Sequence, residues 1–372
     1  MDFAAATRDY ERWMKRQLAA NGLAADAGDL RDKHRTMAKK KRKHAFGFLR
    51  ATYYRWAQLW PEICAGEAEA PRVLAVGDLH LENFGTWRDA EGRLCWGIND
   101  FDEAWRLPYT NDLVRLAASA LLAERASRKF NAAPAAIARA ILAGYAAGLA
   151  SGPKPFVLEE RHAALRAMAY FGEKEPAKFW AGIDEDSRQR KAPARVRKLL
   201  AAAMPERGLA IEFLHREGAG LGSLGRPRHL ARAQWRGGLV AHEAKALVPS
   251  AAAWSEGARA PRSRARDLLD AVTRAGRCRD PYLRFREGWV VRRLAPRSSK
   301  IEIGSLPPRA DPLDLLEQMG RELANVHLAE PRAAAAIARD LARRKRGWLE
   351  AAARRMAAQV VADWKAWRAR HG

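Results

Sequence analysis

Acidic and amide side chains recur between residues 76 and 102 at a spacing suited to phosphoryl transfer. Asp78 and Asn83 lie in Val-Gly-Asp-Leu-His-Leu-Glu-Asn, which fits a short loop after a strand. Asp100 follows a polar turn at 88–93 and an apolar run at 94–98. This pattern predicts a hairpin that returns a second carboxylate beside the first loop. Because Mg²⁺ prefers oxygen ligands, Asn83 and Asp100 would hold it with nucleotide phosphates, while Asp78 would hold a substrate hydroxyl.

The charge distribution sets this segment apart from the rest of the chain. The sequence carries 67 Lys and Arg against 43 Asp and Glu, a net charge of +24. Residues 76–112 nevertheless hold eight acids against three bases, and an acidic cluster in a basic protein favours a cation site. Asp78, Asn83 and Asp100 agree with such a site in both type and spacing. Four other acids are expected instead to cap turns and helices or to pair with arginines: Glu82, Asp89, Glu91 and Glu103.

The same motifs resemble a known fold. Residues 77–83 (Gly-Asp-x-His-x-x-Asn) and 98–102 (Ile-Asn-Asp-Phe-Asp) are similar to the aminoglycoside phosphotransferase and choline kinase branch of the protein-kinase-like fold. Protein kinases share the Asp-x4-Asn spacing and a metal-binding Asp in the next hairpin. A third motif of the branch, Asp-Leu-Ala, looks present at 111–113, where Asp112 would brace the catalytic loop. Val76 departs from the branch, which usually has His or Arg there.

A longer pattern narrows the resemblance. Gly-Asp-x-His-x-Glu-Asn-Phe-Gly followed by Asn-Asp-Phe-Asp-Glu is similar to an uncharacterised bacterial domain, the domain of unknown function 2252 family, placed within that fold. The resemblance is strong over residues 75–120 and patchy over 215–330. It implies that Asp78 is catalytic and that Asn83 and Asp100 are the Mg²⁺ ligands.

A phosphate-gripping element is expected downstream of these motifs. Gly220, Gly222 and Gly225 form a Gly-x-Gly-x-x-Gly pattern, and a strand-like segment follows at 230–235. Lys245 comes after that segment, at about the distance of a hairpin plus one strand. Glycines let backbone N–H groups approach phosphates closely, and a lysine adds a positive charge for the α- and β-phosphates. We therefore expect these four residues to bind the nucleotide.

Two further interpretations of the glycine pattern stay open. A dinucleotide-binding motif requires a strand before the glycines and a helix opening on the last one, whereas Pro227 and a polar segment follow here. An ordinary flexible hairpin is another alternative, and Lys245 could be a strand lysine whose stem covers apolar surface. The acid that would fix Lys245 is not ranked among three candidates: Glu256, Asp267 and Asp270.

A late helix completes the expected fold. Apolar residues recur at helical spacing between Leu313 and His327, in a sequence similar to the helix that normally precedes the catalytic loop of this fold. His327 is expected to be a packed helix residue. The order is then permuted, so we expect an α+β, protein-kinase-like two-lobed fold, circularly permuted, with a large helical lobe and a small antiparallel-sheet lobe. Its expected regions are a basic helical region at 1–75, a catalytic large-lobe segment at 76–205, a small nucleotide-binding lobe at 206–310, and a large-lobe helix with basic C-terminal helices at 311–372.

Composition and cysteine use give expectations about location. Cys64, Cys95 and Cys278 lack the spacing of a disulfide or metal motif, which indicates reduced thiols and a cytoplasmic protein. The N-terminus has no signal-peptide core, and no segment approaches 18 uninterrupted apolar residues. We therefore expect no membrane span.

Two strongly basic segments suggest a further partner. Residues 31–55 carry ten Lys and Arg against one Asp, including the run Lys39-Lys40-Lys41-Arg42-Lys43, and residues 331–372 carry eleven against three. Such segments attract nucleic acid or an anionic surface. A solvated basic face accounts for them equally well.

These observations favour an ATP- and Mg²⁺-dependent phosphotransferase that acts on a hydroxyl of a small molecule or a protein. A permuted order requires the downstream segment to fold over the upstream one. Lys245 should then lie within roughly 10 Å of Asp100, and the helix at 314–327 should pack against the segment that carries Asp78. The alternatives are a non-catalytic or nucleotidyl-transferring kinase-like protein, and a basic nucleic-acid-binding protein whose acidic motif is structural.

Overall fold

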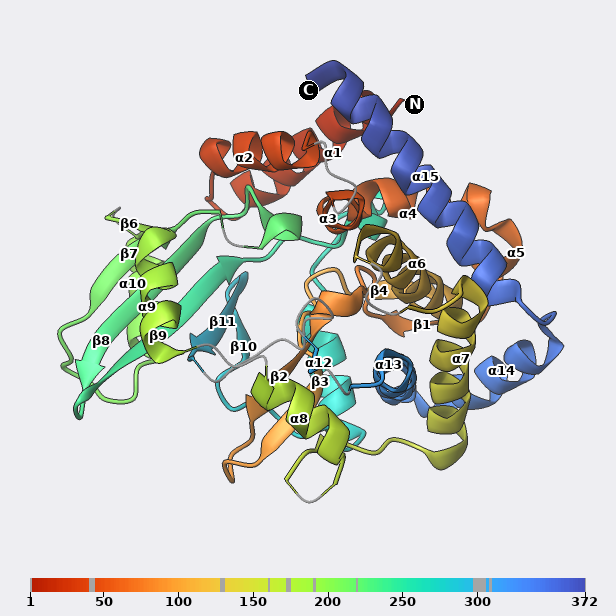
Figure 1. The fold of residues 1–372 in the computed structure, drawn as a ribbon. Coiled ribbons are helices and arrows are strands. Elements are labelled where there is room, and N and C mark those ends of the chain that lie inside the picture. Colours follow the sequence, from red (N-terminus) through yellow and green to blue (C-terminus); the bar gives the residue numbers. More distant parts are fainter. Residues whose placement is uncertain are drawn as a thin grey trace.

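The computed structural model describes residues 2–39, 44–127, 131–159, 161–171, 175–189, 192–218, 220–296, 306–307 and 310–371. It is a mixed α+β chain of helices and small antiparallel sheets, with the largest sheet at one side of the molecule (Figure 1). The α+β prediction is therefore confirmed. Lys40, Lys41, Arg42 and Lys43 of the basic run, and Ala219 of the glycine segment, lie outside the described residues.

The N-terminal region is helical and packs against the last helix of the chain. Its helices are α1 (Phe3–Ala19), α2 (Ala27–Met37), α3 (His44–Ala51), α4 (Tyr53–Ile63) and α5 (Ala65–Ala68). The helix α15 (Trp348–His371) lies across them, so that the two termini are neighbours (Figure 1). Phe3 meets Trp367 edge to face at 5.5 Å, and Arg55 pairs with Asp363 at 3.1 Å. These contacts join the two ends of the chain into one body.

The segment that carries the acidic motifs folds as predicted from its pattern. The strand β1 (Arg72–Ala75) pairs with β4 (Trp105–Pro108), and the loop between residues 76 and 83 ends in the short 3₁₀ helix η1 (Leu81–Asn83). The hairpin consists of β2 (Phe84–Arg88) and β3 (Leu94–Ile98), and β5 (Phe156–Val157) adds to its edge. After β4 the chain enters α6 (Tyr109–Ser127). The predicted hairpin between Asn83 and Asp100 is therefore confirmed.

Two long helices support this segment through close backbone contact. The helices α7 (Pro134–Ser151) and α13 (Pro312–His327) pack along each other, and α13 also contacts β1, β3 and α6. A side chain at Gly144 would clash with the backbone of Glu317, and one at Gly320 would clash with the backbone of Ile141. The expected helix at 314–327 is thus present and packs beside the strand that leads to Asp78. Among the described helices, only α7 is long and apolar enough to cross a membrane. In this fold α7 packs along α13.

A six-stranded antiparallel sheet forms the other part of the molecule (Figure 1). The strand order is β10-β11-β9-β8-β7-β6. Its members are β6 (Ser187–Arg188), β7 (Glu212–Arg216), β8 (Arg228–Trp235), β9 (Gly238–Ala246), β10 (Arg284–Arg286) and β11 (Trp289–Leu294). The expected strand at 230–235 corresponds to β8. Lys245 lies near the end of β9, and the glycine pattern lies in the β7–β8 connection, which contains η2 (Leu221–Ser223).

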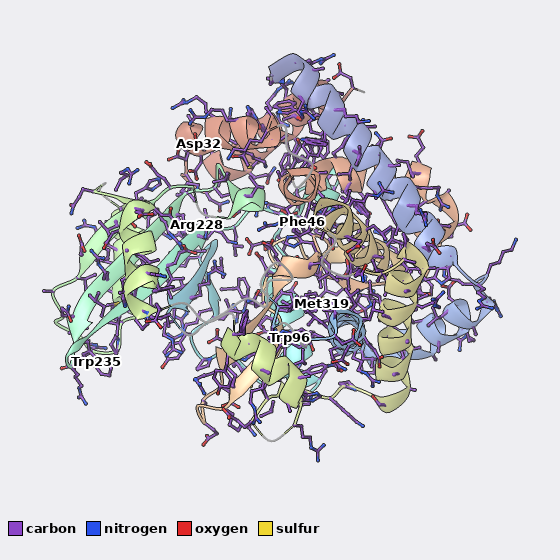
Figure 2. All side chains as sticks on the ribbon, in the orientation of Figure 1. Asp32, Phe46, Trp96, Arg228, Trp235 and Met319 are labelled. Carbon is purple, nitrogen blue, oxygen red and sulfur yellow. The ribbon has the colours of Figure 1, made fainter. Side chains whose placement is uncertain are left out.

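Helices pack against this sheet and connect it to the rest of the chain. Phe179, Trp180 and Ile183 of α9 (Pro176–Glu185) pack with Leu214 and Leu230. The helix α10 (Ala194–Ala201) contacts β8 and β9. The two ends of β8 lie far apart, with Arg228 close to the helical part and Trp235 at the outer tip (Figure 2). The remaining helices are α8 (Ala163–Phe171), α11 (Ala251–Ser255), α12 (Ala265–Arg274) and α14 (Pro331–Arg343).

Candidate functional site

The carboxylate of Asp112 fixes the backbone of the loop that contains Asp78. Asp112, in the first turn of α6, accepts hydrogen bonds from the backbone N–H groups of Val76 at 2.7 Å and Gly77 at 2.9 Å. His327 is buried, lies 3.3 Å from Asp112 and contacts the Tyr145 hydroxyl at 2.8 Å. Gly77 has a φ of 83°, and a side chain there would clash with the backbone of residue 103. The expected bracing role of Asp112 and the packed state of His327 are confirmed by these contacts.

Asp78 itself is held by an arginine that the sequence pattern did not reveal. Arg115, one turn after Asp112 on α6, donates from Nε to Asp78 Oδ1 at 2.9 Å. Its guanidinium also donates to the carbonyl of Leu49 at 2.9 Å and lies 4.9 Å from the ring centroids of both Tyr53 and Trp56. The Arg115 side chain is 0% exposed. An arginine three residues after a helix N-terminal aspartate is the available sequence signal, because such residues share a helix face.

The protonation of Asp78 follows from this environment. Burial raises the pKa of Asp78 to about 7, while the charge of Arg115 acts to lower it and the charges of Glu103 and Asp100 raise it. The side chain is only 18% exposed, which is why the desolvation cost of its charged form is large. A carboxyl group with a pKa near neutrality is suited to exchange protons with a substrate hydroxyl.

The two expected metal ligands are brought together by the end of the hairpin. The backbone N–H of Asn99 donates to the carbonyl of Asn83 at 2.9 Å, so Asp100 follows directly beside the loop. Asn83 is buried, and its Oδ1 accepts the N–H of His80 at 2.7 Å. An amide oxygen has a second lone pair, so this bond leaves room for one more partner. Asp100 is 38% exposed, and its Oδ1 accepts the N–H of Asp102 at 3.2 Å.

Lys245 reaches these acids from the six-stranded sheet. Its Nζ lies 3.8 Å from Asp100 Oδ2 and still closer to Asp102 Oδ2, with which it forms a buried ion pair. The predicted proximity of Lys245 and Asp100 is therefore confirmed. Burial, together with the charge of Asp100, raises the pKa of Asp102 against the opposing charge of Lys245. The contact places two segments that are distant in the sequence on either side of one charged site.

The acid partner of Lys245 differs from the three candidates named from the sequence. Glu256 pairs with Arg72 at 2.6 Å, Asp267 with Arg264 at 2.6 Å, and Asp270 with Arg266 at 3.5 Å. Those expectations were wrong because they assumed a partner near Lys245 in the sequence. Asp102, two residues after Asp100 in the same motif, is the partner instead.

The glycine segment lies directly on Asp78. An ideal Cβ at Gly222 would be 3.5 Å from Asp78 Oδ2 and 2.9 Å from the carbonyl of Arg50. Gly220 and Gly225 adopt φ angles of 75° and 94°, which glycine adopts without a steric penalty. The expected juxtaposition of this loop and the acidic motif is confirmed, while its role toward phosphates stays a prediction.

The N-terminal helices hold this loop in place. Asp29 of α2 accepts the N–H of Gly218 at 3.1 Å, and the N–H of Asp26 donates to the carbonyl of Gly225 at 3.0 Å. Asp26 also contacts His215 of β7 at 3.0 Å. The loop is therefore anchored at both of its ends.

A cluster of arginines surrounds Glu243, two residues before Lys245 on the same face of β9. Glu243 is 0% exposed and accepts hydrogen bonds from Arg228 at 2.7 Å, Arg216 at 2.7 Å and Arg292 at 3.2 Å. Burial acts to raise the pKa of Glu243, but the three guanidinium charges lower it far below its usual value. We call Lys245 and this cluster the basic sheet face, and residues 76–103 the acidic loop. This cluster could not readily be predicted from the sequence, because it depends on the pairing register of four strands.

Most of the other acids behave as expected. Glu82 pairs with Arg50 at 2.7 Å, and Asp89 accepts the N–H groups of Glu91 and Arg93 at 3.0 Å each within the hairpin turn. Glu103 pairs with the buried Arg226 and accepts the N–H of Ala251 at 2.7 Å. These acids therefore hold the fold around the site.

Comparison with known proteins covers the acidic loop but not the basic sheet face. Residues 29–207 match the model of a family described as "Uncharacterized protein conserved in bacteria (DUF2252)". No curated protein and no solved structure matches the chain. The matched segment contains the acidic loop with Asp112 and Arg115, and ends before the glycine segment and Lys245. The part of the chain that carries Asp78, Asn83 and Asp100 is thus similar to this uncharacterised bacterial domain.

Proposed function

We propose that the chain is an ATP- and Mg²⁺-dependent phosphotransferase that transfers a phosphoryl group to a hydroxyl. The observation that carries the proposal is the 3.8 Å approach of Lys245 Nζ to Asp100 Oδ2. A sheet lysine and a loop carboxylate meet there although they come from segments far apart in the sequence. Asp78 and Asn83 belong to the same loop, so one small region offers a base, two oxygen ligands and a cation.

The residues present fit a magnesium ion. Asn83 Oδ1 retains a lone pair, and Asp100 is exposed enough to be reached from solvent. These two side chains would hold the ion through oxygen atoms, as Mg²⁺ prefers, and the ion would neutralise charge on the β- and γ-phosphates. Lys245 would then bind the α- and β-phosphates, and the N–H groups around Gly220, Gly222 and Gly225 would cover them.

In this mechanism the acidic loop handles the acceptor. Asp78 orients the acceptor hydroxyl through Oδ2, since Oδ1 is held by Arg115. The hydroxyl oxygen attacks the γ-phosphorus, the bond to the leaving ADP oxygen breaks, and Asp78 accepts the hydroxyl proton as the new bond forms. Arg115 keeps the carboxylate in position because its guanidinium is fixed by Leu49 and two aromatic rings.

The proposal includes a protein-kinase-like fold in circularly permuted order. Three features support it. The glycine segment connects two adjacent antiparallel strands, β7 and β8, and Lys245 lies on the third, β9. The helix α13 contacts β1, the strand that leads into the acidic loop. The termini lie close together, which makes permutation physically tolerable.

Thermal unfolding with ATP, with and without Mg²⁺, tests the binding part of the proposal. A ligand present at about 100 times its Kd adds about 2.7 kcal/mol of stability, so Mg²⁺ and ATP together should raise Tm clearly. Asp100→Asn should remove the Mg²⁺-dependent part of that rise, and Lys245→Met should weaken ATP affinity at least about tenfold, or about 1.4 kcal/mol.

Matched controls make the result specific. Glu91 is an exposed acid of the neighbouring hairpin turn, and Lys198 is an exposed lysine of α10. Glu91→Gln and Lys198→Met should both leave the rise in Tm and the ATP affinity unchanged. Calorimetry that finds the same Mg²⁺–ATP affinity in Asp100→Asn and in the unaltered protein would remove Asp100 from the site.

A non-catalytic nucleotide-binding protein is the second candidate function. It is favoured by the state of Asp78, which is paired with Arg115 on one oxygen and covered by Gly222 on the other. Measuring ATP consumption distinguishes the two functions. A catalyst consumes ATP in the presence of a hydroxyl acceptor pool such as a metabolite mixture, and Asp78→Asn abolishes that consumption. A binding protein shows the same rise in Tm with no consumption above a heat-inactivated control.

A further inference from the structure

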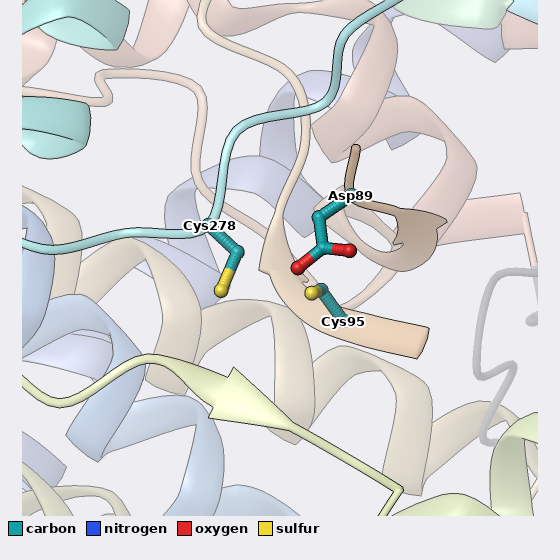
Figure 3. Close-up of side chains that lie close together, drawn as sticks. All are labelled: Asp89, Cys95 and Cys278. Carbon is teal, nitrogen blue, oxygen red and sulfur yellow. The ribbon is translucent and has the colours of Figure 1, made fainter. Parts of the chain in front are cut away.

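Two cysteines that lack a pairing motif in the sequence meet in the fold. Cys95 lies on β3, and Cys278 lies in the irregular segment after α12 (Figure 3). Their sulfur atoms and a carboxylate oxygen of Asp89 all lie within 4.8 Å of one another. All three cysteines are free thiols, as expected, but their spacing in the sequence did not predict this contact, which is made between two regions of the fold. The third cysteine, Cys64, is buried elsewhere beside Arg355.

Asp89 is already committed to other partners. Its Oδ1 accepts the N–H groups of Glu91 and Arg93 at 3.0 Å each. Its Oδ2 accepts Nε and Nη2 of Arg93 at 2.8 and 2.7 Å. A carboxylate offers about four lone-pair sites, and these four bonds fill them. The guanidinium of Arg93 also lies 4.0 Å from the Cys278 sulfur, where it would repel a divalent cation. The cluster is thus better described as a thiol pair than as a three-ligand metal centre.

The two thiols differ in a way that suits a directed reaction. Burial raises the pKa of Cys95, and the neighbouring Cys278 raises it further. Cys95 therefore stays protonated and is 0% exposed. Cys278 is partly exposed, lies beside the Arg93–Asp89 ion pair and lies outside helices and strands. An oxidant from solvent can therefore reach Cys278, whereas Cys95 is covered.

We propose that Cys95 and Cys278 form a reversible modification site for peroxide-class oxidants. The Cys278 thiolate attacks one peroxide oxygen, the O–O bond breaks, and the departing hydroxide takes a proton to give water and a sulfenic acid. The Cys95 sulfur then attacks the Cys278 sulfur, the S–O bond breaks, and the hydroxyl leaves with the Cys95 proton as a second water. Two thiols lose two electrons, the peroxide gains them, and one disulfide results.

The position of the pair determines what the disulfide would do. Arg277, next to Cys278, donates to the carbonyl of Ile98 and pairs with Glu322 at 2.9 Å, and Trp87 donates to the carbonyl of Cys278 at 3.2 Å. The segment after α12 is therefore already docked on the hairpin that precedes Asp100. A disulfide at this seam closes a long loop of the chain, which constrains the unfolded state and raises stability. The inference does not depend on the proposed phosphotransferase function.

The test uses the full-length reduced protein treated with a small excess of hydrogen peroxide. The count of free thiols should fall from three to one, the mass should drop by about 2 Da for the two hydrogens lost, and Tm should rise by several degrees. Peptide mapping without reductant should find Cys95 linked to Cys278, and dithiothreitol should reverse every change. Cys64→Ala should respond like the unaltered protein.

Two variants keep the test falsifiable. Cys278→Ser alters the partly exposed partner and leaves the buried core intact, and it should form no disulfide and show no rise in Tm. Cys95→Ala should likewise block the link. Oxidation of Cys278 to sulfinic acid with no link to Cys95 would overturn the proposal. Stoichiometric retention of Zn²⁺ that Asp89→Ala abolishes would overturn it as well, because the cluster would then be a metal site.

Discussion

The acidic loop and the basic sheet face meet at one site, but they bury charge in opposite ways. On the loop side, Asp78 is held by a single buried guanidinium, Arg115, and burial, aided by the charges of Glu103 and Asp100, raises the pKa of Asp78 to about 7. On the sheet side a single carboxylate, Glu243, is shared by three arginines, and its pKa is lowered. The acidic loop therefore has more anions than cations, and the basic sheet face has more cations than anions.

This difference indicates how the site could divide its work. A field that runs from an excess of positive charge on the sheet to an excess of negative charge on the loop suits a ligand with both signs of charge. A magnesium–nucleotide complex is such a ligand, with phosphates toward Lys245 and the metal toward Asp100. It also implies that substitutions on the two sides have different consequences. Changes in the Glu243 cluster of the sheet should affect stability, and changes at Asp78 on the loop should affect protonation and turnover.

The largest expected effect is on the sheet side. Glu243→Gln removes the carboxylate that Arg216, Arg228 and Arg292 share, and leaves buried guanidinium charge uncompensated. Breaking a buried ion pair in this way costs about 3–5 kcal/mol. We expect the free energy of unfolding, measured in urea, to fall by that amount.

A matched variant on the same sheet tests the role of burial. Glu212 pairs with Arg232 at 2.7 Å, but its side chain is 38% exposed. Glu212→Gln should therefore cost less than about 1 kcal/mol, as exposed ion pairs do. Equal losses in the two variants would contradict the view that burial, and not the number of ion pairs, makes the Glu243 cluster important.

The next effect belongs to the loop side. Asp78→Asn keeps an oxygen to accept the Arg115 hydrogen bond but cannot accept a proton, so turnover should fall by about 10²–10⁴-fold while ATP affinity changes little. Steady-state kinetics with ATP titration measures both. Loss of ATP binding together with turnover would make Asp78 a structural residue, and Glu91→Gln should leave both quantities unchanged.

The pH dependence sharpens the same assignment. A base must be deprotonated to act, and the pKa of Asp78 is raised to about 7, so turnover should rise with pH and level off above about 7. Stability should move the other way. Since the folded pKa lies above the unfolded value of 3.8, this group stabilises the fold below about pH 4 and loses that contribution as pH rises through about 7. Asp78→Asn should lack this loss in urea unfolding measured from pH 4 to 8.

The local motifs could be predicted from the sequence, whereas side-chain partners that are distant in the sequence could not. The common location of Asp78, Asn83 and Asp100 could be predicted because their spacing within one loop and one hairpin is set by short-range backbone geometry. Lys245 could be placed because a strand length separates it from the glycines. Partners such as Arg115 and Asp102 depend on how helix α6 and strand β9 pack against the loop. Such packing is decided by many weak contacts and leaves little mark on nearby sequence.

The cysteines and the arginine cluster were out of reach for the same physical reason. Cys95 and Cys278 meet across the seam between two regions, and the Glu243 cluster requires the register of β7, β8, β9 and β11 to be correct at once. A shift of one residue in any of these strands would turn its charged side chain to the other face. The fold class was within reach of pattern reasoning because helix and strand periods are local, whereas these contacts are not.

The smallest expected effect concerns the basic run at 39–43, which extends the contrast between the two charged regions to the surface. Lys39 is exposed, and the other four members lie outside the described residues. The helix after the run, α3, bears Arg50, which contacts both Glu82 and the glycine segment. If the run binds nucleic acid, affinity for a short duplex should fall steeply with salt, with a logarithmic slope of about 0.9 for each phosphate contact.

Removing the charge of this run separates a specific contact from net charge. Changing all five residues to Gln should reduce the salt slope by up to about 4.5, measured by fluorescence anisotropy at several salt concentrations. The control changes five exposed basic residues of the C-terminal segment to Gln: Arg332, Arg339, Arg343, Lys345 and Arg346. Equal reductions in both variants would mean that net charge, and not the run, drives binding. No binding at low salt would leave the run as a solvated surface, and the contrast between acidic loop and basic sheet face would then be confined to the interior.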